Sequence, residues 1–141
     1  MTEQVQFIAG GQHQDARGTL FFCNDFDLQG IRRFYQIAHH DTTTQRGWRA
    51  HRIERRWFSV CQGAFLIKLI KITDWQQPDP ASPQLSFLLS ADQPGVLQVP
   101  KGYASCLQAT SAPAKVLVFA DSPIEKAADD DYLFPLDYFK P

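Results

Sequence analysis

The sequence has few cysteines and no long apolar run, and each shortage excludes a class of protein. Its three cysteines, Cys23, Cys61 and Cys106, form an odd set without a C-x-x-C spacing. We therefore expect free thiols in a reducing cytoplasm, rather than one disulfide and an unpaired cysteine. No apolar stretch approaches the ~18 residues that span a bilayer, and the first residues lack the pattern of a signal peptide.

The chain also lacks a large excess of charge of either sign, because its formal net charge is −1. We expect neither nucleic acid nor a membrane as a partner. A chain of 141 residues with 44% hydrophobic residues is typical of one domain with one core, here residues 1–141. Eleven of these residues are phenylalanine, which favours strands and sheet interiors.

Short apolar runs between turn signals follow one another along the chain, roughly every eight to twelve residues. They read TLFF, IRRFYQI, RGWRAHRI, WFSV, FLIKLIKI, LSFLL, GVLQVP, CLQAT and KVLVFA. We expect Gly63 to turn a hairpin between WFSV and FLIKLIKI, and FLIKLIKI to be covered on both faces. Only the tail, residues 124–139, has a pattern that permits a helical turn. The sequence therefore predicts an all-β antiparallel sandwich or barrel with a short C-terminal tail.

Polar side chains gather on two of these predicted strands. Alternation along RGWRAHRI gives one face with Arg49, His51 and Ile53 and another with Trp48, Ala50 and Arg52. In IRRFYQI, Arg33 and Tyr35 share a face. If these faces line the interior of a barrel, the two arginines, Tyr35 and His51 form a polar cluster in an apolar wall, as in many binding sites. The alternative is a basic strand edge exposed to solvent.

The residue types in this cluster favour acid–base chemistry over metal binding. Arg49 stands where a His-x-His metal pair would have its first ligand, and a guanidinium cannot ligate a metal. The sequence also lacks a G-x-S-x-G motif and a glycine-rich phosphate loop. A single histidine, His51, can remove a proton next to a carbonyl. Arg49 would hold an oxyanion or phosphate and keep the imidazole neutral, and Tyr35 would supply a phenolic donor.

Four segments in order resemble the sugar-nucleotide cupins. They are DARG (15–18), IRRFYQI (31–37), RGWRAH (46–51) and VPKGYA (99–104). The chain is most similar to the dTDP-4-keto-6-deoxyglucose 3,4-ketoisomerases and WxcM-like domains, and more distantly to dTDP-4-dehydrorhamnose 3,5-epimerase. The resemblance covers about residues 14–139. It implies a double-stranded β-helix, that is, a cupin jelly-roll barrel, which forms a homodimer and acts on a nucleotide-linked 4-keto-6-deoxy sugar without a metal or other cofactor.

The resemblance also implies roles for single residues. Arg17 would bind the diphosphate, Arg46 would do the same or brace the site, and His51 would be the base. Tyr35 matches a tyrosine on the neighbouring pocket strand, and we also count Arg33 and Tyr103 among the candidate substrate contacts. Two departures stand out: Arg49 replaces the first histidine of the family's pair, and Tyr103 is followed by Ala104 and Ser105 rather than by a histidine. The sequence therefore leaves two functions open, an isomerase or epimerase and a cupin module that binds a sugar nucleotide or another anionic small molecule without turnover.

Overall fold

The computed structural model describes residues 3–141 and confirms an all-β protein. Its strands are β1 (Gln6–Ala9), β2 (Gly11–Asp15), β3 (Gly18–Phe22), β4 (Arg33–His39), β5 (Gln45–His51), β6 (Arg56–Lys71), β7 (Leu85–Ser90), β8 (Gly95–Val99), β9 (Tyr103–Ala120) and β10 (Tyr132–Leu133). One helical turn, α1 (Ile124–Ala127), and a 3₁₀ turn, η1 (Ala128–Asp130), lie in the tail. None of the helices in the described residues could span a membrane.

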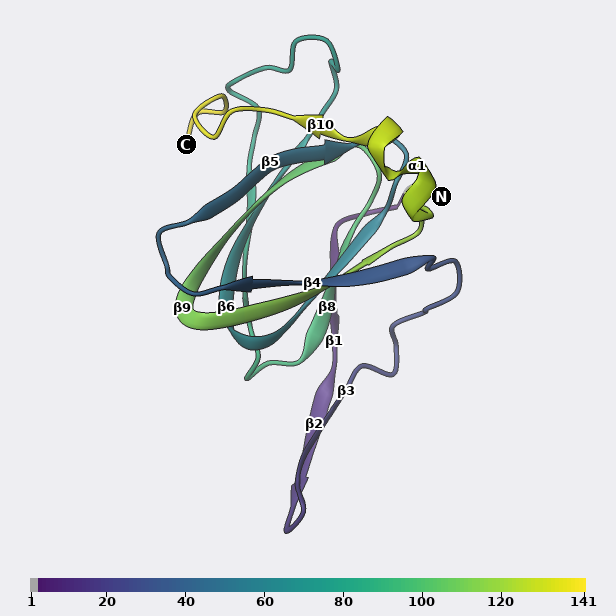
Figure 1. Cartoon of the computed structure of the whole chain (residues 1–141), viewed down its shortest axis with the longest axis vertical. Helices are drawn as coiled ribbons and strands as arrows, with labels where there is room; N and C mark the ends of the chain where they lie inside the picture. Colours follow the sequence, from purple (N-terminus) through teal and green to yellow (C-terminus); the bar gives the residue numbers. More distant parts are fainter. Residues whose placement is uncertain (1–2) are drawn as a thin grey trace.

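Two long antiparallel strands, β6 and β9, organise the fold. The first half of β6 pairs with the second half of β9 and with β8, and the second half of β6 pairs with the first half of β9 and with β7. Both strands thus pass from one layer of sheet into the other. One layer has the order β1-β8-β6-β9-β4 and the opposite layer has the order β7-β6-β9-β5-β10. The two layers face each other, as the expected jelly roll requires (Figure 1).

The predicted hairpin at Gly63 is wrong, because residues 56–71 form one continuous strand. Its register against β9 shifts three times between Val60 and Phe65, so the strand bends there instead of reversing. Gly63 has a φ of +67°, and a Cβ at this position would lie 2.7 Å from the carbonyl oxygen of Pro113. The glycine therefore permits a bulge and a close approach to β9. The predicted strands CLQAT and KVLVFA likewise join into β9.

Apolar side chains fill the space between the two layers. The largest fully buried side chains of this core are Phe58, Phe65, Ile67, Leu69, Leu97, Val116 and Val118. A second cluster, on the other face of the β5 layer, includes Trp48, Ala50, Ile70 and Phe139. The C-terminal tail covers this outer face around Ile70 and Ile72, whereas Leu66 and Lys68 on the same face are half-buried. The expectation that FLIKLIKI is covered on both sides is therefore confirmed for its second half.

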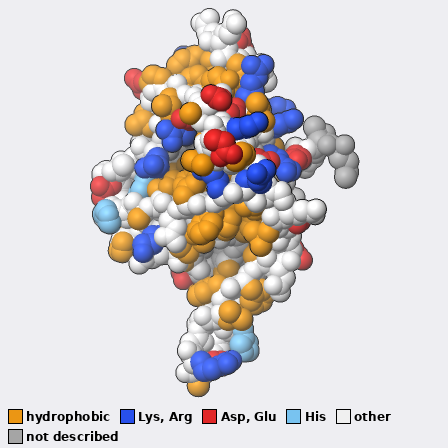
Figure 2. All heavy atoms as spheres, turned by 45° about the vertical axis from the view of Figure 1, so that its right-hand side comes forward, with side chains coloured by type: hydrophobic (Ala, Val, Ile, Leu, Met, Phe, Trp, Pro, Cys, Tyr) orange, Lys and Arg blue, Asp and Glu red, His pale blue; other side chains and the backbone are white. Residues whose placement is uncertain are grey.

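A two-stranded hairpin, β2–β3, projects from the body of the molecule (Figure 1). Among the described residues its strands pair only with each other. Leu20 and Phe21 on β3 are 64% and 56% exposed. Figure 2 shows apolar side chains that continue from the body of the molecule down this arm. The hairpin is thus an extended apolar arm, although an isolated hairpin is marginally stable in water.

Candidate functional site

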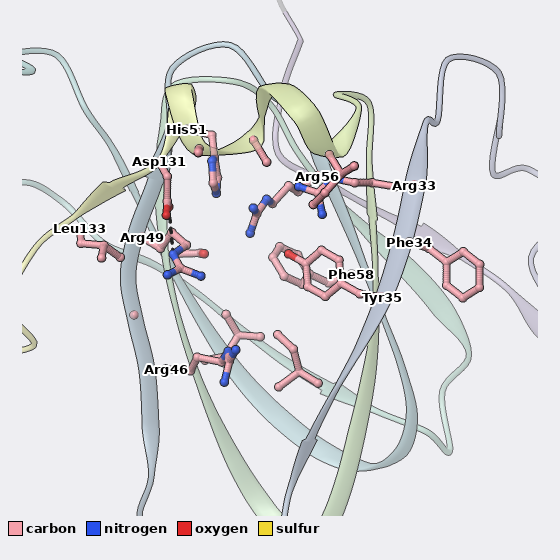
Figure 3. Close-up of a pocket in the computed structure, with 17 residues that line it drawn as sticks. Arg33, Phe34, Tyr35, Arg46, Arg49, His51, Arg56, Phe58, Asp131 and Leu133 are labelled. Atoms are coloured by element: carbon pink, nitrogen blue, oxygen red, sulfur yellow. Dashed lines mark ion pairs between the residues drawn. The ribbon is translucent and has the colours of Figure 1, made fainter.

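A cavity of about 950 Å³ opens between the two layers. Side chains of β4 and β5, the first half of β6 and the first half of β9 form its walls, and residues 124–133 close one side (Figure 3). Its polar lining consists of Arg33, Tyr35, Arg46, Arg49, His51, Arg56, Ser105 and Asp131. The structure therefore brings the four side chains of the predicted polar cluster together with Arg46, which the resemblance also implied, and with Arg56, which the sequence analysis did not name.

Strand alternation explains which side chains of β4 and of the end of β5 line the cavity. Trp48 and Ala50 are buried in the outer cluster, whereas Arg49 and His51 line the cavity. The expectation for Ile53 is wrong, because β5 ends at His51 and Ile53, which follows the strand, is 71% exposed.

Arg46 reaches the cavity through an irregularity in β5. An odd spacing places Arg46 and Arg49 on opposite faces of a regular strand, but the register shifts between them and both line the cavity. Gly47 lies inside this shift. A Cβ there would lie 2.6 Å from the carbonyl oxygen of Ser105, so only glycine fits this close approach to β9.

Two predicted substrate contacts lie outside the cavity lining. Arg17 is at the tip of the β2–β3 hairpin, 89% exposed, with its Nη2 atom 2.6 Å from Oδ2 of Asp15. It does not line the cavity of its own chain. Tyr103 lies directly opposite His51 in the β5–β9 register and packs against the inner core. Both assignments stay predictions.

His51 has the geometry of a neutral base. Only 6% of the residue is exposed, and its Nδ1 atom lies 2.7 Å from the carbonyl oxygen of Asp130. A carbonyl only accepts hydrogen bonds, so Nδ1 carries the proton and Nε2 keeps its lone pair. Nε2 is buried and has no hydrogen-bond partner among the described residues. Burial, and then the positive charge of Arg56, lower the pKa of His51, which keeps the ring neutral at neutral pH.

Asp130 also fixes the backbone that follows His51. Its carboxylate accepts hydrogen bonds from the backbone N–H groups of Arg52 at 2.8 Å, Ile53 at 3.0 Å and Glu54 at 2.8 Å. The same residue therefore orients the histidine through its carbonyl and the next three residues through its side chain.

A buried carboxylate, Glu54, holds two of the cavity arginines. Its side chain is 2% exposed; Oε1 accepts a hydrogen bond from Nη2 of Arg33 at 3.1 Å and Oε2 accepts one from Nε of Arg56 at 2.8 Å. Both guanidiniums also lie over the ring of Tyr35, at 5.3 and 5.8 Å from its centroid. Sequence reasoning missed Glu54 and Arg56, and the one available signal was the charged run ERR (54–56), which begins three residues after His51.

The other two arginines of the cavity differ in their partners. The Nε atom of Arg49 lies 3.0 Å from Oδ1 of Asp131, an ion pair marked in Figure 3. Arg46 has no ion-pair partner within residues 3–141. Nor does this part of the chain contain a group of three His, Cys, Asp or Glu side chains arranged to hold a metal ion. The arrangement is that of an anion-binding cavity with one neutral imidazole.

No protein-family model and no curated protein sequence matches the chain. Solved structures do match it. A dTDP sugar isomerase from Desulfovibrio desulfuricans G20 has a TM-score of 0.78 at 15% identity, over 96% of this chain and 86% of the other. A dTDP-4-dehydrorhamnose 3,5-epimerase from Bacillus anthracis has a TM-score of 0.76 at 17% identity, over 94% and 79%.

A third match is a 3,4-ketoisomerase from Helicobacter canadensis, with a TM-score of 0.70 at 19% identity over 93% of this chain and 91% of the other. At these identities the likeness shows the fold. The expected resemblance is therefore confirmed at that level: the chain has the fold of the dTDP-sugar ketoisomerases and epimerases.

Proposed function

We propose that this protein is an isomerase or epimerase of a nucleotide-linked 4-keto-6-deoxy sugar, which it transforms by proton transfer next to the carbonyl. One observation carries the proposal: the unprotonated Nε2 atom of His51 is buried, has no partner among the described residues, and belongs to a side chain that lines a cavity rich in arginine. A base in this position needs no activation beyond the tautomer that Asp130 fixes.

The proposed reaction has two proton transfers. In the first, Nε2 of His51 takes the proton from the carbon next to the C4 carbonyl, and the electron pair of that C–H bond moves to the carbonyl oxygen to give an enolate. In the second, a proton returns to a different carbon or to the opposite face of the same carbon, and the carbonyl forms again. Tyr35, which lines the cavity under two guanidiniums, is our candidate proton donor for this step.

The neighbouring structures support the substrate class. The epimerase from Bacillus anthracis was solved with TDP and pyrophosphate, and a His-to-Asn variant of a 3,4-ketoisomerase from Thermoanaerobacterium thermosaccharolyticum was solved with TDP-4-keto-6-deoxyglucose. Among the described residues that line the cavity, Arg46 is the arginine without an ion-pair partner, which suits a diphosphate, and Arg33 and Arg49 line the same cavity.

The test is deuterium uptake from D₂O into dTDP-4-keto-6-deoxyglucose, followed by NMR or mass spectrometry. The parent protein should catalyse uptake, and His51→Asn should abolish it while binding of dTDP stays the same. His40→Asn is a matched control, because His40 is exposed on the loop after β4. Uptake by His51→Asn at the parental rate would mean that the base is another residue, and Tyr35 would be the next candidate.

A non-catalytic binding module is the second candidate, and the Arg49 site favours it. Where the family's pair has its first histidine, this chain has Arg49, which is paired with Asp131. His51 is then the one histidine among the described residues that line the cavity. Such a module would bind dTDP-4-keto-6-deoxyglucose in calorimetry and yet leave its hydrogens unexchanged in D₂O. The deuterium experiment and calorimetry on the same sample therefore separate the two functions.

We also propose that the protein is a homodimer. The β2–β3 hairpin exposes Leu20 and Phe21 and has no other strand beside it in the described residues, so a second copy that covers it would bury apolar surface and complete its pairing. Arg17 at the tip of this hairpin could then meet a diphosphate only in the cavity of the second copy. A sedimentation mass near 16.0 kDa at micromolar concentration would contradict the dimer.

A further inference from the structure

Asp131 is the one carboxylate among the described residues that line the cavity. It lies between η1 and β10 with an extended backbone, at a φ of −121° and a ψ of 108°. The carboxylate of its neighbour Asp130 is directed at the backbone after His51, whereas the Asp131 side chain, which is 32% exposed, lines the cavity. A negative charge among four guanidiniums weakens the attraction of the cavity for an anionic ligand. Charge alone therefore does not explain why this residue faces the cavity.

The strand register sets Asp131 beside the candidate base. β10 pairs with β5 in antiparallel order, and Tyr132 lies opposite Ala50. Continued by one residue, this register places Asp131 opposite His51. Opposed residues of an antiparallel pair point to the same face of the sheet, with Cβ atoms roughly 4.5–5.5 Å apart. Both side chains line the cavity and lie on the same side of it in Figure 3, so a sugar carbon within reach of Nε2 of His51 also has the carboxylate of Asp131 nearby.

The carboxylate of Asp131 keeps acceptor capacity for a ligand. Its one ion pair in residues 3–141 joins Oδ1 to Nε of Arg49 at 3.0 Å. Nε of Arg49 nevertheless has no hydrogen-bond partner in this part of the chain, so its N–H is not aimed along that contact. A guanidinium is always protonated and cannot accept a proton, whereas an ionised carboxylate can. With Arg49 in place of a histidine, the second proton acceptor beside His51 is therefore Asp131.

We infer that Asp131 is a second catalytic residue of the cavity, which takes the proton of the substrate's C3 hydroxyl, and that the reaction moves the carbonyl from C4 to C3. This inference rests on the proposed function. An epimerase returns a proton to the opposite face of one carbon and leaves the hydroxyl groups as they are. An isomerase that moves the carbonyl must also remove the proton of the neighbouring hydroxyl, and a carboxylate beside the base can accept it.

Four proton transfers complete this shift. Nε2 of His51 takes the proton of C3, the electron pair of that C–H bond forms a C3=C4 double bond, and the C4 oxygen becomes negative. The imidazolium then gives this proton to the C4 oxygen. Asp131 takes the hydroxyl proton at C3, whose oxygen forms the new carbonyl, while the electrons of the double bond take a proton from Tyr35 at C4. The sugar loses two protons and gains two, and a proton that passes through solvent from Asp131 to Tyr35 restores the protein.

The test follows two events in one reaction, deuterium uptake and movement of the carbonyl, by NMR of dTDP-4-keto-6-deoxyglucose in D₂O. The parent protein should form the 3-keto sugar. Asp131→Asn should still introduce deuterium at C3, because His51 is unchanged, but should form the 3-keto sugar roughly 100- to 10,000-fold more slowly, the range for loss of a general acid or base. Asp129→Asn is the matched control and should behave as the parent, because Asp129 is exposed and does not line the cavity.

Three results would overturn the role of Asp131. One is a parent protein that forms an epimer instead of the 3-keto sugar. Another is an Asp131→Asn variant that forms the 3-keto sugar within about threefold of the parental rate. The third is an equal loss of deuterium uptake and of isomerisation in that variant, which would indicate a structural role. A parent protein that takes up no deuterium would refute the proposed function itself, and the role of Asp131 with it.

Rescue by a small acid separates the basicity of Asp131 from its charge. Formate can enter the space left in Asp131→Ala, because the side chain that it replaces is 32% exposed. It should raise the rate of 3-keto sugar formation by at least about tenfold over Asp131→Ala alone. Chloride, which has the same charge but is a far weaker base, should not. Equal rates with formate and with chloride would show that Asp131 does not act by accepting a proton, and the inference would fall.

Discussion

Replacing Asp130 by alanine should loosen the wall that carries the base. The carboxylate is buried, with the residue 6% exposed, and it accepts hydrogen bonds from three consecutive backbone N–H groups at 2.8, 3.0 and 2.8 Å. Water can replace the carboxylate at Arg52 and Ile53, because both residues are exposed. Water cannot easily reach the N–H of Glu54, because this residue is 3% exposed.

The expected loss follows from these three bonds. A hydrogen bond to a charged group contributes roughly 1.5–3 kcal/mol, and a buried donor left without a partner costs roughly 1–3 kcal/mol. With water at two of the three donors, we expect Asp130→Ala to lower the free energy of unfolding by about 2–4 kcal/mol. In a domain of this size each kcal/mol corresponds to roughly 3 °C in Tm, so the midpoint should fall by about 6–12 °C.

Urea unfolding and calorimetry of Asp130→Ala measure this loss, with Asp129→Ala as the control because Asp129 is exposed one residue earlier. Asp129→Ala should change the free energy of unfolding by less than about 0.5 kcal/mol. The backbone carbonyl that accepts the proton of His51 survives in Asp130→Ala, so the variant also tests whether the side chain is needed to place that carbonyl. Equal stability of the two variants would refute the assignment of Asp130 as an anchor.

Three further results are expected. Arg49→Ala should weaken binding of a dTDP-sugar in calorimetry by about 1.5–3 kcal/mol, and unchanged binding would mean that Arg49 contacts no substrate. The free energy of unfolding should fall as the pH drops below 6.5, because burial lowers the pKa of both His51 and His39 in the folded protein, and the unfolded chain therefore binds protons at a higher pH. Urea titrations from pH 7.5 to about 5 measure this dependence, and a free energy that does not change with pH would contradict it. Phe21→Asp should break the proposed homodimer in sedimentation, whereas a dimer of parental stability would place the interface elsewhere.

Regular strands are the part of the site that the sequence predicts well. On β4, residues two apart face the same way, and Arg33 and Tyr35 line the cavity as alternation requires. Arg49 and His51 follow the same rule at the end of β5. The rule fails where a strand is irregular. Alternation does not predict the register shift in β5 that places Arg46 in the cavity lining, and in the sequence the glycine within a bulge of β6 resembles the glycine of a hairpin turn.

The supports of the site are harder to predict because they are distant in sequence or lie outside regular strands. Asp130 contacts His51 although the two residues are 79 positions apart in the sequence, and it lies in a short turn that the hydrophobic periodicity does not predict. Glu54 lies in the loop between β5 and β6, where a charged residue in ERR is usually exposed, yet it is buried by two arginines that come from different strands. Only the folded arrangement of β4, β5 and β6 gives this carboxylate its partners.

The charges around the cavity support the proposed substrate class. Its lining contains four guanidiniums, and two carboxylates pair with three of them: Glu54 with Arg33 and Arg56, and Asp131 with Arg49. The carboxylate of Asp130 is occupied by backbone N–H groups, and the lowered pKa of His51 keeps that ring uncharged at neutral pH. Two positive charges are left over in a chain whose formal net charge is −1. Concentrated in a cavity with low-dielectric walls, they favour a ligand with two negative charges, which is what the diphosphate of a nucleotide sugar carries.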